Sequence, residues 1–236
     1  MIVQDGVRGA VYRVAIDGPA GAGKSTVAKA VAARLSIEYI DTGAMYRAVG
    51  LKLLAAGVGT DAADAERRAR LLAETEIDFA DGRIYLDGRD VSGEIRTDEI
   101  SRMASACSAL REVREKLVAL QRAMGARKSV LMDGRDIGSN VFPSAEFKFF
   151  LTASPRERAR RRFLELRDKD ENARFERVLA DIERRDYDDS HRDLNPLVRA
   201  ADATEIDSTD MSADEVTELV LGMIREALDA RREAGE

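Results

Sequence analysis

The sequence predicts an α/β fold in which helices cover both faces of a parallel sheet. Short apolar runs, each the length of a buried strand, alternate along the chain with stretches of helical periodicity. A glycine-rich segment joins the first run to the first helical stretch, and polar residues follow several of the runs. Because parallel sheets bind ligands at the carboxyl ends of their strands, we expect a functional site at that edge.

The glycine-rich segment is a complete G-x-x-x-x-G-K-[ST] motif. It runs from Gly18 to Ser25, between an expected strand at 11–16 and an expected helix at 24–35. Glycines allow successive main-chain N–H groups and the positive end of a helix dipole to surround an anion. The context therefore predicts a P-loop NTPase core, in which Lys24 reaches the β- and γ-phosphates of a nucleotide and Ser25 binds Mg²⁺. The residues expected to contact this nucleotide are Gly18, Pro19, Ala20, Gly21, Ala22, Gly23, Lys24, Ser25 and Thr26.

Further apolar runs complete the expected sheet. They cover residues 37–40, 129–132, 147–151 and, more weakly, 204–206. Polar residues at strand ends are Asp17, Asp41, Asp133 and Thr152. An aspartate at the end of such a strand is placed to orient the hydration shell of Mg²⁺, so Asp133 is expected to join Ser25 at the metal. A simple turn after Asp133 would not need the two charges of Arg135 and Asp136.

The segment 42–128, between the second and third expected strands, is far longer than a crossover requires. Its first part, 43–56, has a helical pattern. Residues 77–91 alternate in polarity around Asp-Gly turn signals and predict a small antiparallel hairpin. A helical stripe from Ile100 to Leu110 follows, with Cys107 on its apolar side. We expect an inserted subdomain.

Two capping signals mark helix starts in the last third of the chain. Ser154 precedes Pro155 and stands three residues before Glu157, and Ser212 stands three residues before Glu215. Between them, the apolar residues of 175–182 predict another helix. If this helix continues, Arg185, Asp189 and Arg192 share one face, where they could hold an anion and a ribose or form a surface ladder of salt bridges.

Composition excludes several classes of protein. A net charge of −6 over 236 residues opposes general nucleic-acid binding, which needs a basic surface. No apolar stretch approaches the length of a membrane span, and residues 1–9 do not resemble a secretory signal. With Cys107 as the single cysteine, no intramolecular disulfide can form, which favours a soluble cytoplasmic protein. His191, the single histidine, excludes a metal site with several histidines and is expected at the surface.

Arginines are concentrated between residues 156 and 199, which hold 12 of the 31. A codon bias toward arginine accounts for a high total but not for spacing. Arg158, Arg161 and Arg162 are neighbours on a helix and could close over a triphosphate as a lid. As a solvated face they would instead pair with Glu157 and Glu165.

Taken together, these motifs resemble those of bacterial cytidylate (CMP) kinases. The resemblance covers nearly the whole chain, and its most specific segments are Asp-Val-Ser-Gly-Glu-Ile-Arg-Thr at 90–97 and Asp-Gly-Arg-Asp at 133–136. The other matching segments are 16–25, 41–47, Arg185-Asp186 with Asp189 and Arg192, and 196–198. It implies a Mg²⁺-dependent nucleoside monophosphate kinase that transfers the γ-phosphoryl group of ATP to CMP or dCMP, giving ADP and CDP or dCDP. It further implies a core of 10–41, 129–156 and 172–236, a monophosphate-binding insert of 42–128 and a short helical lid of 157–171.

The resemblance also implies roles for individual residues. The cytosine contacts would be Ser105, Arg114 and Asp136, the acceptor-phosphate contacts Arg47, Arg135 and Arg192, and the ribose contacts Arg185 and Asp189. Thr42 stands where the family often has serine and keeps the hydroxyl for CMP binding. Charge that spreads over the phosphoryl oxygens would be stabilised by Lys24, Arg135, Arg185, Arg158 and Arg162.

Two other classes of protein remain as alternatives. A kinase of the same core acting on a non-nucleotide acceptor such as shikimate would have a shorter insert and would leave Ser105, Arg114 and Asp136 unexplained. A regulatory GTPase would need an Asn-Lys-x-Asp segment, which the sequence lacks. Nothing in the residues indicates a partner other than small nucleotides, and the resemblance favours a monomer.

Overall fold

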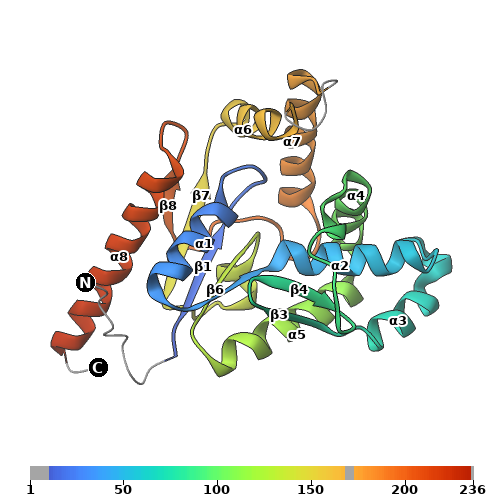
Figure 1. Cartoon of the computed structure of the whole chain (residues 1–236), viewed down its shortest axis with the longest axis horizontal. Helices are drawn as coiled ribbons and strands as arrows, with labels where there is room; N and C mark the ends of the chain where they lie inside the picture. The colour runs from blue at the N-terminus through green and yellow to red at the C-terminus, as the bar shows by residue number, and fades with distance from the viewer. Residues whose placement is uncertain (1–10, 168–172, 235–236) are drawn as a thin grey trace. The chain divides into compact units, whose positions relative to one another are not determined.

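A computed structural model describes residues 11–167 and 173–234 of the chain. Three expectations fall outside this part. They concern residues 1–10, lid residues 168–171 and residue 172, where the following core segment was expected to start. Two compact units are present (Figure 1). The first unit comprises Met1–Tyr39 and Lys128–Glu236, and the second comprises Ile40–Arg127.

The first unit is built on a five-stranded sheet with the strand order β2-β6-β1-β7-β8. Strand β1 pairs in parallel with both β6 and β7, and β7 pairs in parallel with β8. The sheet is flanked by helices, so the predicted α/β class is confirmed. Its strands are β1 (Arg13–Asp17), β2 (Glu38–Asp41), β6 (Val130–Gly134), β7 (Phe147–Thr152) and β8 (Thr204–Asp207).

In the described part of the first unit there are five helical segments. They are α1 (Lys24–Leu35), a π-helical turn η3 (Ile137–Val141), α6 (Pro155–Arg167), α7 (Phe175–His191) and α8 (Ala213–Ala234). Both predicted capping signals are confirmed by hydrogen bonds. Ser154 accepts from the N–H of Glu157 at 3.3 Å, and Ser212 accepts from the N–H of Glu215 at 3.2 Å. Helix α7 ends at His191, so Arg192 lies just past the helix and not on its face as expected.

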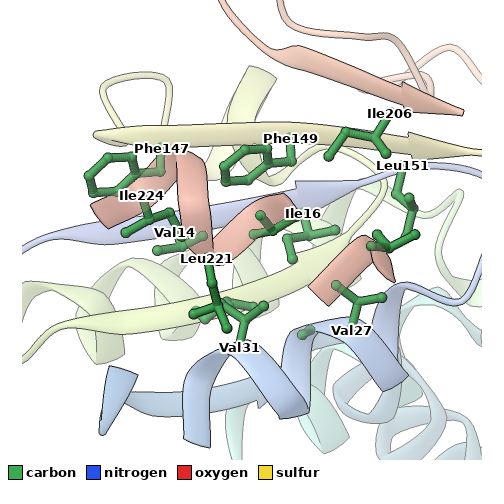
Figure 2. Packing of buried hydrophobic residues seen from close by; sticks show 14 of the residues in the cluster. Val14, Ile16, Val27, Val31, Phe147, Phe149, Leu151, Ile206, Leu221 and Ile224 are labelled. Carbon is green, nitrogen blue, oxygen red and sulfur yellow. The ribbon is translucent and has the colours of Figure 1, made fainter. Parts of the chain in front are cut away.

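The core of the first unit lies between the sheet and helices α1 and α8. Figure 2 shows side chains from β1 and β7, among them Val14, Ile16 and Phe149, directed toward Val31 of α1 and Leu221 of α8. These side chains are buried, and removing each from water contributes roughly 1.5–3 kcal/mol. This packing fixes the position of α1, the helix that follows the glycine-rich loop.

The second unit combines helices with a small antiparallel sheet of order β3-β4-β5. Two-residue turns join the three strands, and Asp81, Gly82, Asp87 and Gly88 all have positive φ, from 50° to 79°. These Asp-Gly turns confirm the predicted signal, although the expected hairpin has a third strand. The elements are α2 (Thr42–Ala55), η1 (Ala62–Asp64), α3 (Ala65–Ala73), β3 (Ile77–Ala80), β4 (Arg83–Leu86), β5 (Arg89–Asp90), η2 (Glu94–Arg96), α4 (Asp98–Cys107) and α5 (Arg111–Arg127).

Two helices of the second unit, α3 and α5, were not predicted. In α5 the buried positions include Arg114 and Gln121 as well as Leu117, so the apolar periodicity that signals a helix is interrupted. Helix α4 is shorter than expected, because the chain turns after Cys107 and Leu110 lies between helices. Among the residues the structure describes, no helix has the length and apolar character to cross a bilayer.

Candidate active site

The glycine-rich loop connects β1 to α1 at the carboxyl edge of the first unit's sheet. Gly18 opens the loop with φ +149°, and a Cβ there would lie 2.0 Å from the carbonyl oxygen of Leu151. No other residue fits against β7 at this point. The loop is therefore held against the edge of the sheet, and its N–H groups gather at the positive end of α1.

Lys24 begins α1 and is 6% exposed. Its Nζ donates a 2.7 Å hydrogen bond to the carbonyl oxygen of Pro19, so the side chain folds back over its own loop. Burial, followed by the positive charge of Arg135, lowers the pKa of Lys24 to about 7. An anion bound in the loop would favour the charged ammonium, so this site is suited to phosphate.

Ser25 and Asp133 meet at the same edge. The Ser25 hydroxyl donates to Oδ2 of Asp133 at 2.8 Å, and the hydroxyl of Tyr39 donates to Oδ1 at 2.7 Å. A serine hydroxyl beside a buried carboxylate is a pair of hard oxygen ligands and fits Mg²⁺. Within the described residues, no group of three or more His, Cys, Asp or Glu side chains could hold a metal. A divalent ion at Ser25 and Asp133 would therefore take its remaining ligands from phosphate and water, as Mg²⁺ does.

Two residues of this edge, Tyr39 and Asp17, were not assigned a role from the sequence. Tyr39 lies in an apolar run, where a tyrosine is indistinguishable from core. Asp17 was noted only as a strand end. Its carboxylate accepts hydrogen bonds from the N–H groups of Ile137 and Gly138, at 2.8 and 2.7 Å. Burial raises the pKa of Asp17 to about 6, against the opposing effect of these hydrogen bonds.

A charged network follows β6 and extends to the end of α7. Nε of Arg135 lies 2.6 Å from Oδ2 of Asp189, and Nη2 of Arg192 lies 3.3 Å from Oδ1 of Asp136. Arg192 also approaches Asp189 at 3.9 Å. Burial opposes ionisation of Asp189, but the charge of Arg135 overcomes it and lowers the pKa of that carboxyl.

Arg185 adds a third positive charge near this network. Its pKa is lowered, first by burial and then by the charge of Arg135. The positive charge of Arg135 therefore acts against that of Arg185, and an anion bound beside Arg185 would favour its charged form. The expected alternative of a surface ladder is only partly correct: salt bridges are present, but Arg192 and Asp136 have side chains only 8% and 7% exposed.

The arginines of α6 point in different directions. Arg162 pairs with Glu165 at 3.0 Å in an exposed position, and Arg161 pairs with Glu157 and donates to Ser208. These contacts include the pairing with Glu157 and Glu165 that a solvated face predicts. Arg158 differs from the expectation of a lid arginine that faces a triphosphate. It is 3% exposed and binds two carbonyl groups and the carboxylate of Asp186, because its position on α6 faces α7 and the loop.

A cavity of about 490 Å³ adjoins the glycine-rich loop. Its walls are the loop and start of α1 from Gly21 to Val27, α6 residues that include Arg160, Arg161 and Arg162, and the segment from Ser208 to Val216. This volume falls in the range of small-molecule sites. Arg162 lines the cavity and Arg158 does not. The Ser208–Ser212 wall was not anticipated, since nothing in its composition marks it as a ligand contact.

The remaining predicted contacts lie in the second unit. Thr42 is buried at the start of α2, and Asp41 caps this helix and pairs with Arg47 at 3.0 Å. Arg114 is 3% exposed, and its guanidinium carbon lies 5.9 Å from the centre of the Tyr46 ring. Ser105, on α4, is half-buried.

Tyr46 is a further residue for which the sequence suggested no role. It precedes Arg47 on α2, where helical periodicity does not distinguish a core tyrosine from one under a guanidinium. Cys107 is fully buried, as predicted, and burial raises the pKa of its thiol to about 12, so it is unreactive. His191 is exposed, also as predicted.

Comparison with known proteins gives a consistent result. A family model described as cytidylate kinase matches residues 14–226. The chain is 50% identical to the cytidylate kinase of Clostridioides difficile over 211 residues, which cover 89% of this chain and 97% of that one. It is also 50% identical to the cytidylate kinase of Caldanaerobacter subterraneus, over 90% of this chain and 94% of that one.

A solved structure shares the fold. An uncharacterized protein from Eubacterium ventriosum superposes with a TM-score of 0.50 at 14% sequence identity, over 92% of this chain and 99% of that chain. At this identity the similarity concerns the fold alone.

Proposed function

The chain belongs to the cytidylate kinase family and is a phosphotransferase, and we propose that it transfers the γ-phosphoryl group of ATP to CMP or dCMP with Mg²⁺ bound. The observation that carries this proposal is the meeting of Lys24, Ser25 and Asp133 at the glycine-rich loop, with an arginine network in the same unit. The products are ADP and CDP or dCDP.

The donor nucleotide occupies the loop and the adjoining cavity. The residues proposed for ATP are the loop from Gly18 to Thr26, whose N–H groups surround the phosphates. Lys24 leaves the carbonyl of Pro19 and reaches the β- and γ-phosphates. Arg162 lines the cavity and is free to rotate from Glu165 toward the phosphates, since both side chains are exposed.

Ser25 and Asp133 are the residues proposed to hold Mg²⁺. When bound, the ion neutralises charge on the β- and γ-phosphates. Tyr39 keeps the Asp133 carboxylate oriented through its 2.7 Å hydrogen bond. The Ser25 hydroxyl donates a hydrogen bond to Asp133 in this structure, which leaves the lone pairs of its oxygen for the ion.

Individual residues are proposed for each part of the acceptor nucleotide. In the first unit, Arg135 and Arg192 bind the phosphate of CMP, Arg185 and Asp189 the ribose, and Asp136 the cytosine base. Asp136 is ion-paired with Arg192, so the residue proposed for the base lies next to a residue proposed for the phosphate. In the second unit, Ser105 and Arg114 contact the base, Arg47 the phosphate, and Thr42 supports the nucleotide through its hydroxyl.

Transfer needs no general base, because the acceptor is already an anionic phosphate. Two polyanions must be aligned against their repulsion, and the negative charge that spreads over the transferred group must be stabilised. Lys24, Arg135, Arg185 and Arg162 supply positive charge for this step. Exclusion of water from the site prevents wasteful hydrolysis of ATP.

The domain roles follow from the same reaction. We assign residues 42–128 to a monophosphate-binding insert, 157–171 to a lid, and the segments 10–41, 129–156 and 172–236 to the core. We further propose a cytoplasmic, monomeric enzyme of pyrimidine nucleotide metabolism.

A coupled assay across acceptors tests the proposal. Purified protein with Mg²⁺ and ATP is incubated with CMP, dCMP, UMP, AMP or shikimate, and ADP formation is measured. We expect the highest kcat/KM with CMP or dCMP, and no turnover by the Lys24→Met variant, which controls for contaminating kinases. Failure to form CDP, or a preference for shikimate, would contradict the proposal.

A further inference from the structure

The guanidinium of Arg158 joins two segments of the first unit. Its Nε donates to the carbonyl oxygen of Ala153 at 2.8 Å, and its Nη1 donates to the carbonyl oxygen of Ala20 at 3.0 Å. Ala153 lies between β7 and α6, and Ala20 lies within the glycine-rich loop. One buried side chain therefore binds a carbonyl of the loop directly.

Asp186 holds this guanidinium from the other side. Its Oδ1 accepts from Nη1 of Arg158 at 3.0 Å, and its Oδ2 accepts from Nη2 at 2.6 Å. Such a bidentate pair fixes orientation as well as distance. Asp186 follows Arg185 on α7 and stands three residues before Asp189. The helix that carries both proposed ribose contacts is thus connected to the loop through Arg158.

Gly21 of the loop also packs closely against α6 and α7. Gly21 has φ +75°, and a Cβ there would lie 3.2 Å from Cβ of Arg158 and 3.3 Å from Cδ1 of Ile182. The loop therefore lies directly on α6 and α7. These two helices are themselves packed together through the buried residues Ala159, Val178 and Ile182, and they lie side by side in Figure 1.

We infer that Arg158 and Asp186 are positioning residues that hold the glycine-rich loop in its phosphate-binding shape and set the position of α7 relative to it. This inference rests on the proposed function, since α7 carries residues assigned to the acceptor. Neither side chain lines the cavity beside the loop. Arg158 acts through the Ala20 carbonyl, and Asp186 acts through Arg158.

A purely structural ion pair would behave differently. Replacing both partners of a buried ion pair by apolar side chains is often tolerated, whereas removing one partner lowers stability. For a purely structural pair, stability alone would change. Arg158, however, divides its donors among two carbonyl groups and a carboxylate, which lysine cannot do from a single nitrogen. Substitution should therefore alter nucleotide binding and turnover beyond any change in stability.

The test compares Arg158→Lys and Asp186→Asn with matched controls on another pair. Arg34 and Glu218 form an exposed bidentate pair, with Nη1–Oε1 at 2.7 Å and Nη2–Oε2 at 3.2 Å, so Arg34→Lys and Glu218→Gln make the same chemical changes away from the loop. ADP affinity is measured by calorimetry without acceptor, kcat and both KM values by the coupled assay, and melting temperature by circular dichroism.

We expect Arg158→Lys to weaken ADP binding about 10-fold and to lower kcat by about 10- to 100-fold. Asp186→Asn should raise KM for CMP by about 5- to 10-fold, because α7 loses one of its two hydrogen bonds to Arg158. The two changes should be non-additive in the double variant, since both act on one guanidinium. The controls should stay within about 2-fold of wild type.

Other results would overturn the inference. A folded Arg158→Lys variant with wild-type ADP affinity and kcat would do so, as would a folded Asp186→Asn variant with wild-type KM for CMP, even if their melting temperatures fall. If Arg158→Lys does not fold, Asp186→Asn decides by its KM for CMP. The ADP titration requires no phosphoryl transfer, so failure of the proposed function would appear as absent CDP and would leave the test of the loop intact.

Discussion

Asp136 and Arg192 form a nearly buried ion pair in which Oδ1 of the aspartate lies 3.3 Å from Nη2 of the arginine. Asp136 follows β6, and Arg192 lies immediately after α7. Asn140 also donates to Asp136, at 3.0 Å. The proposed contact to cytosine is therefore oriented by the proposed contact to the acceptor phosphate.

Replacement of Asp136 by alanine should relax the choice of base. We expect the ratio of kcat/KM for CMP to that for UMP to fall by about 10- to 100-fold, because a buried hydrogen-bonding partner of the base is lost. ATP affinity should change less. The ratio is measured in the coupled assay, with Asp229→Ala, from an exposed pair with Arg232 on α8, as control. An unchanged ratio would remove Asp136 from the base site.

Tyr39 should influence Mg²⁺ through Asp133. The Tyr39→Phe variant removes only the hydroxyl that donates to Oδ1 of Asp133. Loss of one such hydrogen bond costs about 1 kcal/mol, so we expect the Mg²⁺ concentration for half-maximal rate to rise about 5-fold. Tyr12→Phe is the matched control, since the Tyr12 ring contacts Phe147 in an edge-to-face arrangement. A Mg²⁺ requirement equal to that of wild type would contradict this role.

Tyr46 should support Arg114 through its ring. The guanidinium lies over the ring at 5.9 Å, and such cation–π contacts contribute roughly 0.5–2 kcal/mol. We expect Tyr46→Leu to raise KM for CMP about 5-fold and to leave KM for ATP unchanged. Tyr46→Phe keeps the ring and should restore wild-type values. Equal effects of the two substitutions would show that the ring is not what matters.

The raised pKa of Asp17 predicts how stability depends on pH. The carboxyl has a pKa of about 6 in the folded protein, against 3.8 as its ordinary value, because it is buried. Between these values the folded state retains a proton that the unfolded state releases. The contribution of Asp17 to stability therefore falls as pH rises from about 4 to 6, by up to about 1.4 kcal/mol per pH unit, and is constant above that.

Urea unfolding of wild type and Asp17→Asn at several pH values checks this prediction. The amide does not titrate, so wild type should lose stability relative to the variant as pH rises through this window. The variant should also lose one of the two hydrogen bonds from Ile137 and Gly138, because its NH₂ group faces an N–H donor and cannot accept from it. This loss lowers its stability at low pH. A difference between the two proteins that is independent of pH would contradict the raised pKa.

Much of the fold was predictable because its signals are local. The helix at 24–35 was predicted with its observed bounds, and the Asp-Gly turns and both capping serines occupy their expected places. Each depends on residues within a few positions of one another. Helix α5 was missed for the converse reason, since Arg114 and Gln121 occupy buried positions through contacts with distant residues such as Tyr46 and Met45.

By itself, the sequence determined the five strands of the parallel sheet, the glycine-rich loop with Lys24 and Ser25, and membership of a family through motifs at 90–97 and 133–136. Only the tertiary structure decided which partner each charged side chain has. It buried Arg158 against Asp186, 28 residues away, and left Arg162 at the cavity, although the two arginines are four residues apart on one helix. The reason is physical: spacing sets the face of a helix on which a residue lies, whereas the direction of that face depends on what the helix packs against.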